Sequence, residues 1–220
     1  STAKPTTTTL SMARAYSISP DITRPAARAM LSVVVVGFAV LWPMIRCSQH
    51  IDTRTHVWFT LRDAVVIFVP MQAVIWPQHL PILASWSAPV VAAVSALALA
   101  WLLVLAGVLS LAMGSIQRSS GREAVRVAWM GIFLLAVFAA PIVGALRPLG
   151  AGVEAGQPRV GWLLSPVTGV LELVRDRREL GTAARVFPQH WRMILAIACV
   201  GIALLMIARA FEVARNRYAA

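Results

Sequence analysis

The chain has 220 residues, of which 59% are hydrophobic and only 13% are charged. Soluble domains carry about a quarter charged residues, so this composition excludes an ordinary water-soluble fold. The formal net charge is +11, but many arginines stand at the ends of apolar runs, where cations meet lipid phosphates, which argues against a nucleic-acid partner. We expect an all-α polytopic bundle in a bacterial inner (cytoplasmic) membrane.

The N-terminal 28 residues are polar and rich in Thr, Ser and Pro, and they predict a retained arm that is too polar to fold alone. No small-x-small cleavage site closes the first apolar run, which argues against a cleaved secretory signal. Residues 29–215 are expected to form one transmembrane helical domain, and residues 216–220 a tail.

A helix needs about 20 apolar residues to cross the hydrocarbon, and about five spans are expected, with four to six allowed. The second run carries Pro70, Pro77 and Pro81, and we expect it to be kinked or broken. In chain order the expected spans are Met30–Ile45, Ala64–Leu83, Pro89–Met113, Ala128–Leu146 and Met193–Ala208.

Between the last two spans lies an apolar segment, Val160–Val174, that is too short to cross easily. Ser165 and Pro166 divide it, and Glu172 stands near its end. A re-entrant or interfacial helix fits this segment better than a full crossing. One interpretation of the Ser165–Pro166 break is a helix that merely packs at the interface; the other is a re-entrant element that lines an opening.

No metal, cofactor or catalytic site is expected. The four histidines lie outside clean spans and lack the i, i+3 or i, i+4 spacing of a ligand pair, although His50, His56 and Asp52 share one polar loop. The sequence has no GxSxG, HExxH or Walker motif, so we predict no enzymatic activity for this chain alone. Cys47 and Cys199 are read as small packing residues.

Ionised side chains inside a membrane usually carry function, and essentially none is expected here. Asp63, Glu123, Glu154 and Glu212 stand at or beyond the ends of the expected spans. Their positions argue against proton pumps and ion-coupled carriers. The mixed-sign run from Arg175 to Glu179 is interpreted as a solvated helix face.

A short basic loop, Gly114–Arg126, connects the third and fourth expected spans. Arg118, Arg122 and Glu123 in this loop are candidates for docking a cytoplasmic partner; the alternative is an ordinary interfacial connector.

The stretch from Leu97 to Ala214 resembles the latter part of an ABC-2 type transporter permease. LSLAMGSIQRSSGREAVRVA has the texture of a long helix, a small-residue turn and a basic loop, and LSPVTGVLELV stands where the family has a short helix before its last span. The resemblance implies a permease subunit of an ATP-driven transporter, with a separate ATP-binding subunit and a second permease copy. It also implies that Gln117–Arg126 faces the cytoplasm.

The first half departs from that pattern, because the family begins with a short amphipathic helix and not with a long polar arm. The alternative is a non-catalytic structural or accessory subunit of a large respiratory or photosynthetic membrane complex, whose arm would contact neighbouring subunits. The distribution of Arg and Lys between alternate loops does not settle the orientation in the membrane.

Overall fold

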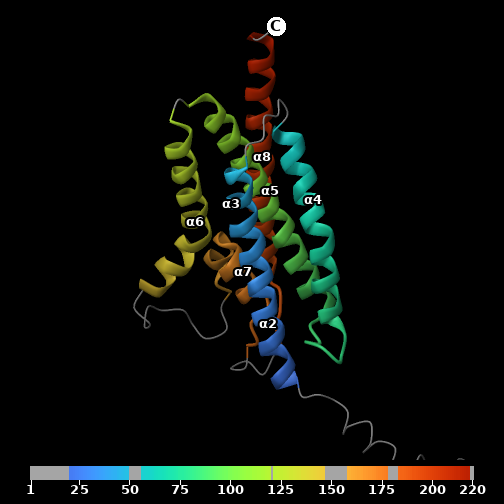
Figure 1. Ribbon diagram of the computed structural model, residues 1–220. Helices are drawn as coiled ribbons and strands as arrows, with labels where there is room; N and C mark the ends of the chain where they lie inside the picture. The colour runs from blue at the N-terminus through green and yellow to red at the C-terminus, as the bar shows by residue number, and fades with distance from the viewer. Residues whose placement is uncertain (1–19, 50–55, 120, 147–157, 178–182, 219–220) are drawn as a thin grey trace, which may run out of the picture.

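The computed structural model describes residues 20–49, 56–119, 121–146, 158–177 and 183–218, and all elements in these ranges are helical. In Figure 1 the helices run alternately up and down a bundle, so that Pro20 and Tyr218 lie toward opposite ends. We call the end where α2 begins the lower end and the end where α8 finishes the upper end. The expected all-α helical bundle is confirmed.

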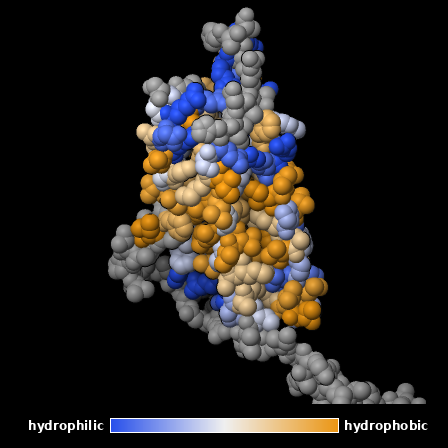
Figure 2. Space-filling view, in the orientation of Figure 1, coloured by the Kyte–Doolittle hydropathy of each residue, from blue (hydrophilic) through white to orange (hydrophobic). Residues whose placement is uncertain are grey.

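Four of the described segments are long and apolar enough to cross a membrane: Thr23–Ser48, His56–His79, Ala88–Gln117 and Pro188–Arg215. The sixth helix, α6 (Arg122–Leu146), has 25 residues and lies beside them in Figure 1. Figure 2 shows a broad band of apolar side chains between polar groups at the upper and lower ends, as expected where lipid surrounds the middle of a bundle. The chain is an integral membrane protein.

The first crossing is longer than its apolar run. It consists of α2 (Pro20–Val36), a π-helical turn η1 (Gly37–Leu41) and α3 (Trp42–Ser48). Pro43 has no amide hydrogen to give to the carbonyl of Ala39, and a π-helical turn, which bonds five residues ahead, accommodates this loss. Residues 20–28 of the expected arm therefore belong to α2, and the expectations for residues 1–19 lie outside the described residues.

The second crossing is α4 (His56–Ile75), followed by the 3₁₀ turn η2 (Trp76–His79). The expected break occurs at Pro77, whereas the helix continues through Pro70. The side-chain amide of Gln78 donates to the carbonyl oxygen of Val74 at 3.2 Å as the helix ends. Because α4 starts eight residues before the expected span, Asp63 lies inside it.

The centre of the bundle is α5 (Ala88–Arg118), and most of its residues are buried. It makes its most extensive contact with α8 (Pro188–Tyr218). Glycine allows this close crossing: a Cβ added at Gly107 would lie 2.6 Å from the Cβ of Leu204, and one added at Gly201 would lie 2.7 Å from the amide nitrogen of Val104. Close backbone contact through small residues is the usual basis of helix association in lipid.

Candidate functional site

A short helical hairpin enters the bundle from its lower end. Its arms are the 3₁₀ helix η3 (Val160–Leu164) and α7 (Pro166–Leu173), which pack against each other. At the tip, the indole nitrogen of Trp101 donates to the carbonyl oxygen of Leu163 at 3.1 Å. Trp101 stands 13 residues after the start of α5, about 20 Å along its axis. The hairpin tip therefore lies deep inside the bundle, between helices that cross it.

Ser165 and Pro166 form this tip, and both are buried. Ser165 has extended backbone angles (φ −130°, ψ 141°) and separates η3 from α7. Its hydroxyl donates to the carbonyl oxygen of Val137 in α6 at 2.7 Å. Irregular backbone at membrane depth is tolerated where protein buries it or where it lines a cavity. Protein buries the interruption at Ser165, because this region contacts both α5 and α6.

The contact between Ser165 and Val137 compensates for a missing backbone hydrogen bond in α6. In a regular helix the amide of residue 141 would donate to the carbonyl of Val137, but residue 141 is a proline and has no amide hydrogen. The hydroxyl of Ser165 supplies the missing donor. Pro141 and Ser165 are 24 residues apart in the sequence. Pro141 leaves the Val137 carbonyl without its helical donor, and Ser165 provides the hydrogen bond in its place.

Close packing around a glycine also holds the hairpin. A Cβ added at Gly169 would lie 2.8 Å from the Leu97 side chain in α5 and 3.1 Å from the Cα of Leu163. Any larger residue at position 169 would move α7 away from α5 or from its own first arm.

A buried carboxylate joins the two arms at the lower end. Oε1 of Glu172 accepts the backbone amide hydrogen of Arg159 at 3.0 Å and a guanidinium hydrogen of Arg177 at 3.0 Å. The side chains of Glu172 and Arg177 are 0% and 2% exposed, so this is a buried ion pair. The imidazole of His190, at the start of α8, lies 3.9 Å from the same oxygen. Glu172 therefore ties α7 to the segment before η3 and to the loop that leads into α8.

A second carboxylate, Asp176, joins this loop to the first crossing. It accepts hydrogen bonds from Arg24 at 3.3 Å and from Arg28 at 2.7 Å, both in α2. Arg28 also donates twice to the carbonyl oxygen of Val174, at 2.8 and 3.1 Å. These contacts close the end of α7 against α2. The expectation of a solvated face is wrong for Arg177 and Asp176, and Arg178 and Glu179 lie outside the described residues.

The expectation that the spans hold almost no charge is also wrong. Asp63 is buried in α4 and pairs with Arg46 of α3 at 2.5 Å. Glu212 is buried in α8 and accepts the amide hydrogen of Val57 at 2.9 Å, which caps the first turn of α4. Each of these carboxylates has a cation or a helix terminus beside it, as buried charges require. The sequence spacing gave no sign of these partners, because they come from other crossings.

The predicted docking residues lie at the upper end, opposite the hairpin mouth. Arg118 is the last residue of α5, and its side chain lies outside the described part of the chain. Arg122 and Glu123 begin α6 and are exposed. Glu123 pairs with Arg126 at 2.9 Å, one turn further along the helix. The loop is thus available to a partner at the face opposite the hairpin.

No group of three potential metal ligands occurs among the residues that the structure describes. His56 is buried at the start of α4, where its Nε2 lies 3.0 Å from Oε1 of Gln117; His50 and Asp52 are outside the described ranges. His56 and His190 thus contact polar groups between elements, whereas His79 is exposed in η2.

Comparison with known proteins identified no relative of this chain. No family model matches the chain, and no curated protein or solved structure shows significant similarity to it. The likeness to ABC-2 permeases stays a prediction from the sequence.

Proposed function

We propose that this chain is the membrane-embedded permease subunit of an ATP-driven transporter and works with a separate ATPase subunit. The observation that carries the proposal is the re-entrant hairpin η3–α7, whose broken tip at Ser165 reaches deep between α5 and α6. A bundle that only anchors a protein has no need of a hairpin whose helix is interrupted at this depth by Ser165 and Pro166. Interrupted helices of this kind form substrate sites in many transporters; in this proposal the buried tip becomes part of such a site when α6 moves away from Ser165.

The position of the exposed loop supports the same proposal. Arg122 and Glu123 lie at the upper end, whereas the mouth of the hairpin lies at the lower end. A transporter that is driven by a soluble ATPase needs a docking surface on its cytoplasmic face. It also needs an opening on the opposite face of the membrane that changes shape when the ATPase acts. In this proposal α6 connects the two, because it begins at the docking loop and contacts Ser165 through Val137.

The experiment is a mild-detergent purification of the native protein, with mass spectrometry of its partners and a visible absorption spectrum. An ATP-binding subunit and a colourless sample are expected. Arg122→Glu should release that subunit, because it reverses an exposed charge in the proposed docking surface. Arg192→Glu, an exposed charge reversal near the other end of the bundle, is the matched control and should retain it.

A second candidate is an accessory subunit of a large membrane complex. The observation in its favour is the apolar surface of α4 and α8, most of which is not covered by any helix in the described ranges. Exposed residues such as Val65, Val69, Leu195 and Met206 could contact neighbouring subunits as readily as lipid. Co-purification with haem, chlorophyll or iron–sulfur proteins would support this candidate and overturn the permease proposal.

A further inference from the structure

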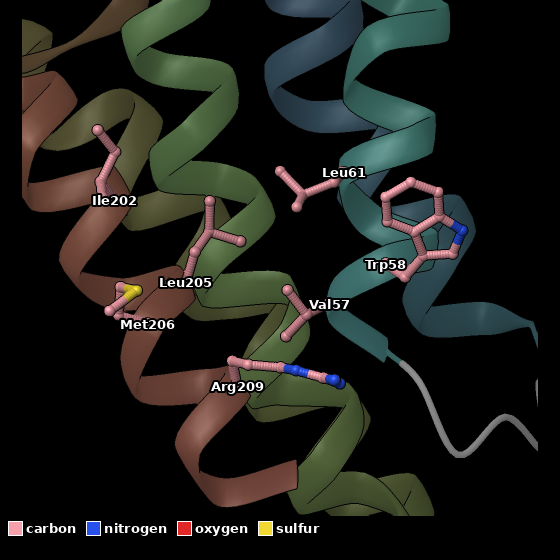
Figure 3. A pocket seen from close by; sticks show the side chains of 7 residues that line it. All are labelled: Val57, Trp58, Leu61, Ile202, Leu205, Met206 and Arg209. Carbon is pink, nitrogen blue, oxygen red and sulfur yellow. The ribbon is translucent and has the colours of Figure 1, made fainter. Parts of the chain in front are cut away.

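An apolar groove lies between α4 and α8 on the outside of the bundle. Its volume is about 530 Å³, within the range of roughly 300–1,000 Å³ that is usual for small-molecule sites. Figure 3 shows α4 side chains on one side of the groove and α8 side chains on the other. The lining comprises Val57, Trp58, Leu61, Ile202, Leu205, Met206 and Arg209.

Arg209 is the only charged residue in this lining, and it closes one end of the groove. Its side chain extends from α8 toward the first turn of α4, next to Val57 (Figure 3). One guanidinium nitrogen donates to Glu212 at 2.8 Å, and the Arg209 side chain remains 55% exposed. A guanidinium has five N–H donors in a planar fork, so Arg209 can hold a second anion while it keeps its contact with Glu212.

The polarity of the groove runs in one direction along the membrane normal. Ile202 and Arg209 are seven residues apart on α8, about 10 Å along the helix axis. One leaflet contributes about half of the roughly 30 Å hydrocarbon core. Beyond Arg209 the helix becomes polar, with Glu212, Arg215 and Arg217, and the exposed Trp58 stands at the same end of α4. The groove therefore starts at the water interface with a cation and continues into one leaflet.

We propose that this groove binds one phospholipid of that leaflet, with its phosphate on the guanidinium of Arg209 and an acyl chain between α4 and α8. The anionic phosphate matches the single cation, and the chain matches the six apolar residues. A partner helix is about 10 Å wide and would lie across the exposed faces of α4 and α8, whereas a single acyl chain is narrow enough to lie within the groove, so the dimensions favour an acyl chain. The proposal does not depend on the transport function.

The test compares two lipids by native mass spectrometry of the delipidated protein in detergent. Dioleoylphosphatidylglycerol and dioleoylglycerol have the same acyl chains, but only the first has a phosphate. Because hydrogen bonds to a charged group are stronger than neutral ones, we expect the wild-type protein to bind the phospholipid at least about tenfold more tightly. Arg209→Gln should remove most of this preference, since an amide can still contact Glu212 but carries no charge.

Ile202→Trp tests the apolar part of the groove. Ile202 is 52% exposed, so the larger side chain fills the groove without disturbing the core, and binding of both lipids should fall at least about tenfold. Ile207→Trp, also exposed on α8 but outside the lining, and Arg192→Gln are the controls that should bind as the wild type does. Equal binding of the two lipids by the wild type, or unchanged binding by Arg209→Gln and Ile202→Trp, would overturn the proposal. Co-purification of a polypeptide that crosslinks to position 202 would also overturn it.

Discussion

Ser165 of the re-entrant hairpin donates its hydroxyl hydrogen to the carbonyl oxygen of Val137, which Pro141 leaves without a partner in its own helix. In water a solvent molecule could take this role, but the hydrocarbon core has none to offer. Ser165 at the hairpin tip thus replaces the hydrogen-bond donor that Pro141 of α6 lacks. The position of the hairpin therefore depends on the missing backbone hydrogen bond at Pro141 in α6.

Ser165→Ala should destabilise the protein by about 1–3 kcal/mol, because it leaves a buried carbonyl unpaired. In the Pro141→Ala background the same substitution should cost clearly less, since the alanine amide can again donate to Val137. The free energies of unfolding in detergent micelles, measured for the four combinations, give the coupling between the two positions. Ser95→Ala is the control, because this buried hydroxyl has no hydrogen-bond partner among the described residues. Purely additive losses would contradict the pairing.

Gly201→Ala should destabilise the α5–α8 contact by about 1–3 kcal/mol, as overpacking in a core does. The added methyl group would lie 2.7 Å from the amide nitrogen of Val104, which is backbone and cannot turn aside. Gly131→Ala in α6 is the matched control, because a Cβ there meets no atom within 4 Å. That control should be neutral or slightly stabilising. The test compares the midpoints of thermal unfolding of the two variants in the same detergent. Equal midpoints would argue against the close crossing of α5 and α8.

Glu172→Gln should cost about 3–5 kcal/mol, because it removes the buried carboxylate that pairs with the buried guanidinium of Arg177. Glu123→Gln makes the same chemical change at a side chain that is 80% exposed, and should cost less than about 1 kcal/mol. The comparison uses the free energy of unfolding at neutral pH. Limited proteolysis between residues 158 and 188 gives a second readout, since release of the hairpin should expose this segment only in the Glu172 variant.

The alternating course of the helices predicts that positions 121 and 183 lie on opposite sides of the membrane. Gly121→Cys and Ala183→Cys test this in a background in which Cys47 and Cys199 are replaced by alanine. In sealed vesicles of uniform orientation, a membrane-impermeant maleimide should label only one of the two cysteines. After permeabilisation both should react. Labelling of both from the same side would show that the chain crosses the membrane an even number of times between them.

Four of the five expected spans overlap the four described segments that are long and apolar enough to cross a membrane, but hydropathy did not locate their ends. The fifth expected span, Ala128–Leu146, falls in α6, which starts six residues earlier, at Arg122, and is not among those four segments. The span expected at Met193–Ala208 likewise continues in α8 to Tyr218. Helical hydrogen bonding does not stop where polar side chains begin, so helices extend into the interface beyond their apolar runs.

The site was less predictable than the fold. The apolar segment divided by Ser165 and Pro166 pointed to a hairpin or an interfacial helix, but its partners come from α5 and α6. Glu172 looked like a charge near a helix end, and its burial depends on Arg177 and His190, which approach it through tertiary folding. One signal was present in the sequence: an acidic residue inside an apolar helix, which is costly in lipid unless a cation neutralises it.

The crossing of α5 and α8 through Gly107 and Gly201 has a mechanical consequence. Because the backbones meet closely at these glycines, sliding or rotation of one helix would bring side chains of one helix against the backbone of the other, and we expect the two helices to move together. Any change of shape in this protein then takes place at the less extensive contacts of α4 and α6 with that body. The groove between α4 and α8 lies at the first of these contacts, and the hairpin tip, which Ser165 joins to α6, lies next to the second, so motion of α4 or α6 would change both sites.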